Sequence, residues 1–327
     1  MAEISHGAFR RLVADFGGCD WFFTEMLSAG AVTNNSPYSP WYLDFGPSPE
    51  RTIVQLAGNE PDLFAAAAGR LSALPIAGVD INMGCSVHKI RKKGWGIELM
   101  KDRDLAASII DSVRPRLSGQ SLSVKIRIGH SEDPERLLGF CRTMIDAGVD
   151  FITLNPRTVN TNRDRPGDWN YIKLLRNELK VPIVGNGEIK DSDSLRRRMS
   201  IAGTGPLMIG RGAVQSPWIF HRLKGFPAAP AQETSPLIRN HTVLPGETVQ
   251  RFLHYLELYQ PADFRLSRAR RFFYYFCDNF KFGTRMNTHI QNAAEISRIG
   301  QIFFSYLERN PQEQQLNLAQ EAVSAEL

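Results

Sequence analysis

Hydrophobic residues in the first two thirds of the chain follow two alternating patterns. Short apolar runs, many of them rich in β-branched residues, predict strands at 21–24, 52–56, 79–83, 123–128, 151–154, 182–184 and 207–209. Longer stretches between them carry apolar residues at helical spacing and predict amphipathic helices at 60–72, 104–117, 134–147, 169–179 and 192–202. Because parallel strands need crossover connections, this alternation predicts a parallel α/β fold.

The number of predicted strands leaves one position of a barrel open. Seven strands are visible, whereas a closed (β/α)8 barrel needs eight, and the chain starts almost directly on the helical stretch "ISHGAFRRLVADFGG". Either the barrel is open at one edge or a first strand lies upstream of residue 1. Since an open edge strand is a pairing hazard, we expect the second. The prediction is an α/β TIM barrel over residues 1–225 with its first strand truncated.

The pattern changes after the last predicted strand. Residues 226–246, "FPAAPAQETSPLIRNHTVLPG", are rich in proline and predict a linker. From 247 to 310 apolar residues recur at helical spacing, which predicts a C-terminal all-helical domain of three or four helices. Residues 311–327 are polar and predict a flexible tail.

Composition narrows the function classes. The four cysteines are widely scattered without metal-ligand spacing, which argues against a disulfide framework or a metal site and favours a reducing, cytoplasmic setting. Neither a membrane-length apolar run nor a signal peptide is apparent, so no membrane association is expected. The net charge of +5 suits a polyanionic partner such as nucleic acid, although mild basicity is also common in enzymes without one.

Polar residues gather where the predicted strands end, which is where TIM barrels carry their chemistry. Two of these endings, "VGNGEI" and "IGRGAV", predict a phosphate-binding site, because glycine lets backbone N–H groups approach an anion and Arg211 adds a forked cation. Lys125 could lie beside a flavin ring or form a salt bridge with Glu188. The strand-end residues are Glu25, Gln55, Asn82, Cys85, Lys125, Arg127, Asn155, Arg157, Asn186, Glu188, Gly210 and Arg211.

Six motifs in order, "FRRLVADFGGCDWFFTEMLSA", "QLAG", "DINMGC", "VKIRIG", "NGEI" and "MIGRGA", carry a family resemblance. From the first helix to about residue 307, the chain resembles the FMN-dependent tRNA-dihydrouridine synthases, which combine a TIM barrel with a helical tRNA-binding domain. The resemblance implies that specific tRNA uridines are reduced at the 5,6 double bond by FMN, with NADPH as reductant. The flavin would pass a hydride to C6, and Cys85 would protonate C5 as general acid, since a cysteine thiol retains its proton at neutral pH.

The resemblance also implies the binding residues and a monomer. For FMN they are Met1, Gln55, Lys125, Asn155, Asn186, Gly187, Glu188, Gly210 and Arg211. For tRNA they are Asn82 at the uracil, with Arg127, Arg157, Lys92, Arg268 and Arg271. The basic run after Cys85 and the arginines of "RLSRARRFFYYF" suit phosphate contacts, although an ordinary solvated helix face would also explain the latter.

The sequence departs from the family pattern at several positions. Ser86 stands where the family has proline, Asn155 stands where it has histidine, and only Met1 and Ala2 match the end of its first strand. Trp95 could stack on a nucleotide or pack against the barrel rim. Two other functions stay open: an FMN-dependent oxidoreductase acting on a small molecule, and a catalytically impaired RNA-binding relative. The basic C-terminal helices count against the first of these.

Overall fold

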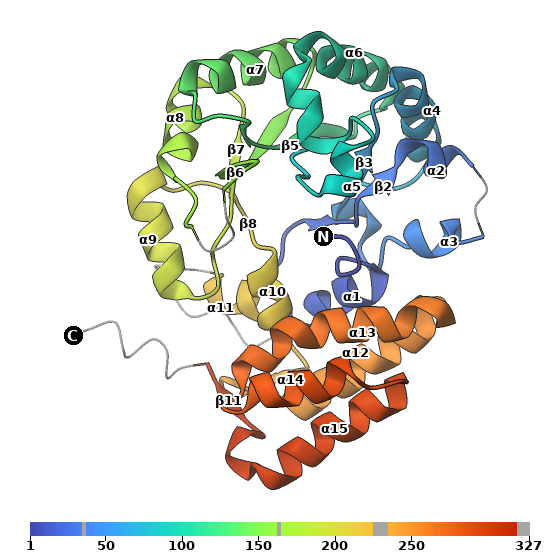
Figure 1. The fold of residues 1–327 in the computed structure, drawn as a ribbon, viewed down its shortest axis with the longest axis vertical. Coiled ribbons are helices and arrows are strands. Elements are labelled where there is room, and N and C mark those ends of the chain that lie inside the picture. Colours follow the sequence, from blue (N-terminus) through green and yellow to red (C-terminus); the bar gives the residue numbers. More distant parts are fainter. Residues whose placement is uncertain (35–36, 162–164, 225–234, 319–327) are drawn as a thin grey trace.

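A computed structural model describes residues 1–34, 37–161, 165–224 and 235–318 (Figure 1). Its main sheet is parallel and curled, with the order β1-β3-β4-β5-β6-β7-β8, and β2 also pairs with β3. Every predicted strand position is confirmed. The strands are β1 (Phe22–Phe23), β2 (Leu27–Ser28), β3 (Thr52–Ala57), β4 (Gly78–Met83), β5 (Ser121–Gly129), β6 (Phe151–Thr158), β7 (Ile183–Asn186) and β8 (Leu207–Met208).

Five helices cover the outer face of this sheet, as Figure 1 shows: α4 (Pro61–Ser72), α6 (Arg103–Val113), α7 (Pro134–Asp146), α8 (Asn170–Glu178) and α9 (Ser192–Ala202). Each turns an apolar stripe inward, and α6 for example buries Ala106, Ile109, Ile110 and Val113. An aspartate begins three of them by accepting a hydrogen bond from a first-turn N–H, namely Asp102, Asp133 and Asp191. The predicted helices are therefore confirmed as crossover connections.

The curled sheet is open on one side within the described residues. No ladder joins β8 to β1 there. At the carboxyl ends of the strands, the first residues of the chain cross this opening. A Cβ placed on Gly210, after β8, would lie 3.2 Å from Sδ of Met1. The backbone N–H of Glu3 donates to Glu25 Oε1, after β1, at 2.5 Å. The N-terminal residues thus join the two edge strands at the mouth of the barrel.

The C-terminal part is a helical bundle, as expected. Its helices are α12 (Pro245–Tyr259), α13 (Ala262–Phe276), α14 (Gly283–Gln291) and α15 (Ile296–Arg309). Stacked aromatic rings fill the centre, with Phe252, Phe272 and Phe276 at centroid separations of 4.0 and 4.9 Å. Helix α1 (Gly7–Phe16) packs against α12, and its apolar face belongs to the same core. The first helix of the chain therefore ties the bundle to the barrel.

The predicted linker and tail differ in part from the structure. Residues 225–234 and 319–327 lie outside the described residues. The remainder of the predicted linker forms β9 (Ile238–Arg239) and β10 (Thr242–Val243), and the start of the predicted tail forms η5 (Pro311–Glu313) and β11 (Leu316–Asn317). Strand β11 pairs with β10, so the segment up to residue 318 is built into a small antiparallel sheet.

Short elements complete the chain. They are α2 (Ala29–Thr33), α3 (Ser39–Tyr42), η1 (Pro49–Arg51), α5 (His88–Arg91), η2 (Gly96–Lys101), η3 (Arg114–Arg116), α10 (Arg211–Gln215), α11 (Ile219–Leu223) and η4 (Cys277–Asn279). Among the helices of the described residues, none combines the length and the apolar character needed to cross a bilayer.

Candidate active site

Four polar side chains on three neighbouring strands form a hydrogen-bonded chain inside the barrel. Gln55, near the end of β3, donates through Nε2 to Asp80 Oδ2 at 2.7 Å, and its Oε1 accepts from Asn82 Nδ2 at 2.9 Å. Ser123 of β5 donates to the other oxygen of Asp80 at 2.6 Å. These residues meet because alternate residues of a strand face the same side and the register sets Gln55 beside Asp80.

This chain continues into the loop that carries Cys85. The Oδ1 atom of Asn82 accepts the backbone N–H of Cys85 at 2.9 Å, and the carbonyl oxygen of Cys85 accepts the N–H of Ile97 at 3.1 Å. Gly96 has φ +65°, and a Cβ there would lie 2.6 Å from the Cys85 carbonyl oxygen, so only glycine fits. Arg127 donates to the carbonyl of Gly84 at 3.0 Å. The backbone that bears the thiol is therefore fixed from several sides.

The thiol of Cys85 differs from the other three cysteines in exposure. Cys19, Cys141 and Cys277 are buried, whereas Cys85 is half-exposed. Burial raises the pKa of each buried thiol to about 12. Their burial makes these three packing residues, and Cys85 is the accessible thiol of the described residues.

Lys125 lies on β5, opposite Asn82 in the strand register. Burial lowers the pKa of Lys125 to about 8, the negative charge of Asp80 raises it, and Arg127 lowers it further. Burial also raises the pKa of Asp80 to about 7, although its hydrogen bonds and Lys125 act in the opposite direction. Lys125 thus shares the barrel interior with Asp80, and Cys85 is close enough to influence its titration.

Two asparagines continue the polar lining on the next strands. Asn155 of β6 donates to Asn186 Oδ1 at 3.4 Å, and Asn186 of β7 donates to the Met208 carbonyl at 2.8 Å. In the part of the chain that the structure describes, the buried atoms Asn155 Oδ1 and Thr153 Oγ1 have no hydrogen-bond partner. Since buried acceptors are normally satisfied, these atoms are available to a ligand.

Glu188 is held by cations. It accepts from Arg157 Nη2, from Arg198 Nη2 at 2.5 Å and from the N–H of Gly167 at 2.8 Å. Its own φ of +59° is in the left-handed region, next to Gly187 with φ +138°. Glu188 therefore forms its salt bridges with Arg157 and Arg198. The alternative prediction, a Lys125–Glu188 salt bridge, is not what the structure shows for this carboxylate.

The remaining strand-end residues lie at the same mouth. Gly210 is the residue before α10 and lies against Met1, while Arg211 is exposed at the start of that helix. Arg127 bonds the backbone carbonyls of Gly84 and Thr158, so it braces two strand ends rather than projecting freely.

The basic run after Cys85 forms part of the rim. Lys89, Lys92 and Lys93 are exposed, while Arg91 pairs with Glu98 at 2.6 Å. Nζ of Lys93 lies 4.6 Å from the ring centroid of Trp95. That indole donates to Asn59 Oδ1 at 3.0 Å, which supports the packing interpretation of the tryptophan.

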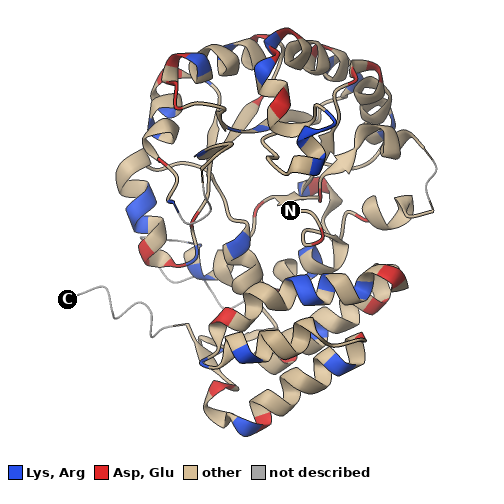
Figure 2. Ribbon diagram, in the orientation of Figure 1, with Lys and Arg blue, Asp and Glu red and all other residues tan. Residues whose placement is uncertain are grey.

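Two arginines predicted to contact RNA have partners within the protein. Arg268 is only 4% exposed and pairs with the buried Glu25 at 2.8 Å. The structure thus gives Arg268 an interdomain role, which differs from the predicted phosphate contact, because a buried guanidinium cannot reach RNA. Arg271 is exposed and pairs with Glu3 at 2.8 Å. Figure 2 shows Lys and Arg on α5, α9 and α13.

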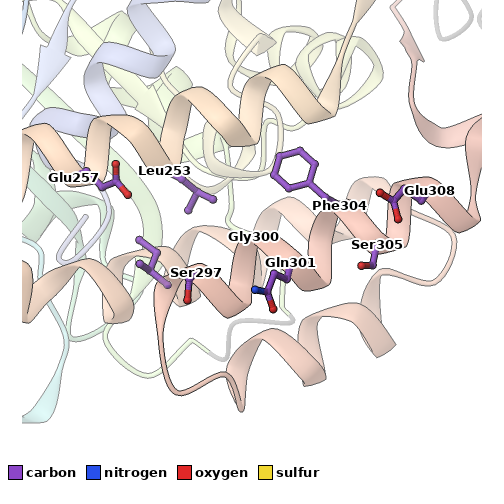
Figure 3. A pocket seen from close by; sticks show the side chains of 9 residues that line it. Leu253, Glu257, Ser297, Gly300, Gln301, Phe304, Ser305 and Glu308 are labelled. Atoms are coloured by element: carbon purple, nitrogen blue, oxygen red, sulfur yellow. The ribbon is translucent and has the colours of Figure 1, made fainter.

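A surface groove of about 520 Å³ lies away from this site, between α12 and α15. Figure 3 shows Leu253 and Phe304 pointing into it, with Glu257 and Glu308 toward its two ends. It contains none of the predicted site residues.

Sequence reasoning missed Asp80 and Ser123. The signal for Asp80 is present in "DINMGC", because residues 80 and 82 lie on the same face of one strand. Its contact with Gln55 depends on the pairing of β3 with β4, which a single sequence does not contain.

Comparisons with known proteins agree with this architecture. Residues 1–301 match the family model described as dihydrouridine synthase. The chain is 26% identical over 280 residues to probable tRNA-dihydrouridine synthase 1 of Synechocystis sp., covering 86% of this chain and 77% of that protein. It is 29% identical over 248 residues to tRNA-dihydrouridine synthase B of Pseudomonas aeruginosa, covering 74% of each. Against the probable tRNA-dihydrouridine synthase of Rhodobacter capsulatus, identity is 33% over 222 residues, covering 67% of each.

Proposed function

The chain belongs to the dihydrouridine synthase family, and from this premise we propose that it reduces the 5,6 double bond of uridines in tRNA, with Cys85 as the general acid. The observation that carries the proposal is the placement of the Cys85 thiol. It is accessible, it stands on a loop fixed through Asn82, and it neighbours Lys125 at the carboxyl ends of the strands. A general acid needs such a fixed position, because it must stay within reach of the carbon that it protonates.

The lining residues fit a flavin mononucleotide. We propose that Gln55, Lys125, Asn155 and Asn186 hold its ring system, and that Met1, Gly187, Gly210 and Arg211 lie around its ribityl phosphate. The unpartnered Asn155 Oδ1 supports this assignment, because a flavin ring offers an N–H that such an acceptor can bind. When bound and reduced by NADPH, FMN would supply the hydride for C6 of uridine. We propose that Glu188, which pairs with Arg157 and Arg198, also lies beside the flavin mononucleotide.

The chain's own groups would perform the other tasks. Cys85 donates its proton to C5, after which the thiolate is reprotonated from solvent. The second N–H of Asn82 Nδ2 is available to a carbonyl oxygen of the uracil, since the first is used by Gln55. Lys125 as a cation stabilises negative charge that develops during transfer. The exposed Lys89 and Lys92 beside the loop are placed for tRNA phosphates.

Complementation tests the proposal. In a strain that lacks the gene, we expect tRNA to lose dihydrouridine at the positions that this enzyme modifies, and the wild-type gene to restore it. Cys85→Ala is expected to lower the rate by roughly 100-fold or more, the usual contribution of a general acid. Cys141→Ala is the matched control, because it removes a buried thiol of the same size. Full activity of Cys85→Ala would refute the assignment of the acid.

A further inference from the structure

The hydrogen-bonded chain from Asp80 to Cys85 has two ends of fixed character. At one end the carboxylate of Asp80, which is fully buried, accepts from Gln55. At the other end the backbone N–H groups of Gly84 and Cys85 donate to Asn82 Oδ1, at 3.3 and 2.9 Å. Only the two amides between these ends, of Gln55 and Asn82, can rotate to exchange oxygen for nitrogen.

Both ends select the same orientation of the amides. An ionised carboxylate only accepts, so Gln55 must direct its NH2 group toward Asp80 and its oxygen toward Asn82. A backbone N–H only donates, so Asn82 must direct its oxygen toward Cys85 and its NH2 group toward Gln55. A flipped amide would face two donors or two acceptors against each other in a buried site, which costs more than an ordinary lost hydrogen bond.

We propose that Asp80 is a positioning residue, whose carboxylate fixes the orientation of the Gln55 and Asn82 amides and thereby holds the backbone of Cys85. The consequence for the reaction rests on the proposed function: Asn82 always presents an N–H, never its oxygen, to the pyrimidine. A uracil carbonyl accepts such a group. Burial raises the pKa of Asp80 to about 7, and the hydrogen bonds from Ser123 and Gln55 together with Lys125 favour the ionised form that this arrangement requires, so exchange is measured above pH 7.

Exchanging the side chains at positions 80 and 82 tests the proposal. Asn82→Asp alone sets carboxylates on both sides of Gln55, so the Gln55 oxygen must face one of them. Combining it with Asp80→Asn restores a complete chain of opposite direction. Asn at position 80 would accept from Ser123 and donate to Gln55, and Gln55 would donate to Asp at position 82, whose other oxygen accepts from Cys85. The double variant has the same composition and net charge as the wild type.

Hydrogen exchange of the Cys85 amide is the readout, measured on the full-length purified protein. We expect Asn82→Asp to speed exchange at Cys85 by about 3- to 10-fold, because the new carboxylate loses the hydrogen bond to Gln55 that holds this side chain toward the Cys85 N–H. The double variant should return it to within about twofold of the wild type. Asp80→Asn alone completes the cycle. Exchange in the double variant as fast as in Asn82→Asp would overturn the proposal, because a merely structural role for Asp80 predicts no rescue.

Turnover measured on the same four proteins separates this inference from the proposed function. The double variant should stay inactive, because Asp at position 82 cannot donate to a uracil carbonyl. If Asn82→Asp weakens the protection of the Cys85 amide against exchange and the double variant restores it, the positioning role holds even if none of the four proteins reduces uridine. Unequal thermal stability is controlled by Ile81→Ala, which creates a cavity on the same strand and should leave Cys85 exchange unchanged.

Discussion

Lys125 is a cation whose pKa the barrel lowers to about 8, chiefly by burial, so its titration should be visible in stability. Between pH 8 and the ordinary lysine pKa of 10.5, the unfolded chain still binds a proton that the folded protein has released. Below pH 8 the folded protein bears the full cost of burying the charge, and stability rises with pH through this window by at most about 3 kcal/mol as that cost is removed. We expect urea unfolding between pH 7 and 10 to show this rise in the wild type, and Lys125→Met to lack it. Parallel curves for the two proteins would contradict the titration.

The same titration should affect turnover in the opposite sense. Above pH 8 the side chain becomes neutral, so the rate of uridine reduction should fall if the cation stabilises developing charge. Lys125→Arg keeps its positive charge at higher pH, so the decline of the rate should begin at a higher pH. The guanidinium group has a different shape from the lysine ammonium, and we expect it to lower the rate at neutral pH. An alkaline decline that is identical in both proteins would assign it to another group.

At this scale the sequence predicted which residues lie at the strand ends but not how they pair. Lys125, Asn155 and Asn186 were found because they follow apolar runs, and the runs are short enough to be strands. The partners of Glu188 could not be predicted, because Arg157 reaches it from β6, 31 positions earlier in the chain. Pairing is a property of tertiary structure, whereas position at a strand end is a property of the local pattern.

The segment from the end of β4 to the start of η2 fixes the thiol, and Gly96, the first residue of η2, is tightly constrained. Gly96→Ala would place a Cβ 2.6 Å from the Cys85 carbonyl oxygen in a left-handed conformation. We expect it to cost roughly 1–3 kcal/mol and to lower activity by more than the lost folded fraction explains. Gly94→Ala is the matched control, because it has a similar φ of +71° and its nearest neighbour is the Asn59 side chain at 3.1 Å. Urea unfolding and turnover of both variants check this; equal losses of activity would contradict it.

Elements were predictable where they leave an apolar run or a helical period in the sequence. The crossover helices and the strands of the parallel sheet leave a clear period in the sequence, and their ends differ by only a few residues, as for β5, predicted at 123–128 and observed at Ser121–Gly129. Strands β9, β10 and β11 were missed because two residues each leave no periodicity in a proline-rich or polar stretch, whereas the equally short β1 and β8 lie within longer apolar runs. The pairing of β10 with β11 also joins residues about 75 positions apart, which only the packed helices bring together.

At the scale of the whole molecule, the barrel and the bundle share a core and a buried ion pair. Helix α1 contributes its apolar face to the aromatic core of the bundle, although the sequence predicts it as part of the barrel domain. The Arg268–Glu25 pair connects α13 to the residues after β1. Exposure of an arginine cannot be judged from its own helix when the opposing surface belongs to another domain, and this is why Arg268 was predicted as an RNA contact.

Arg268 and Arg271 of α13 should therefore respond differently to removal. Arg268→Ala leaves Glu25 buried without its cation, so we expect a loss of about 3–5 kcal/mol in the free energy of unfolding. Arg271→Ala breaks an exposed pair with Glu3 and should cost less than about 1 kcal/mol. Urea unfolding of both variants measures the difference. Arg268→Met combined with Glu25→Gln should recover part of the loss, because neither buried group then carries a charge.

Binding of tRNA distinguishes the same two residues a second time. If Arg271 exchanges Glu3 for a phosphate, Arg271→Ala should weaken tRNA binding and reduce the slope of log affinity against log salt by about 1. Folded Arg268→Ala should keep the wild-type slope, since a buried guanidinium releases no counterion. A reduced slope in Arg268→Ala but not in Arg271→Ala would mean that the bundle opens on binding RNA, and that the buried ion pair of the free protein gives way to a phosphate contact.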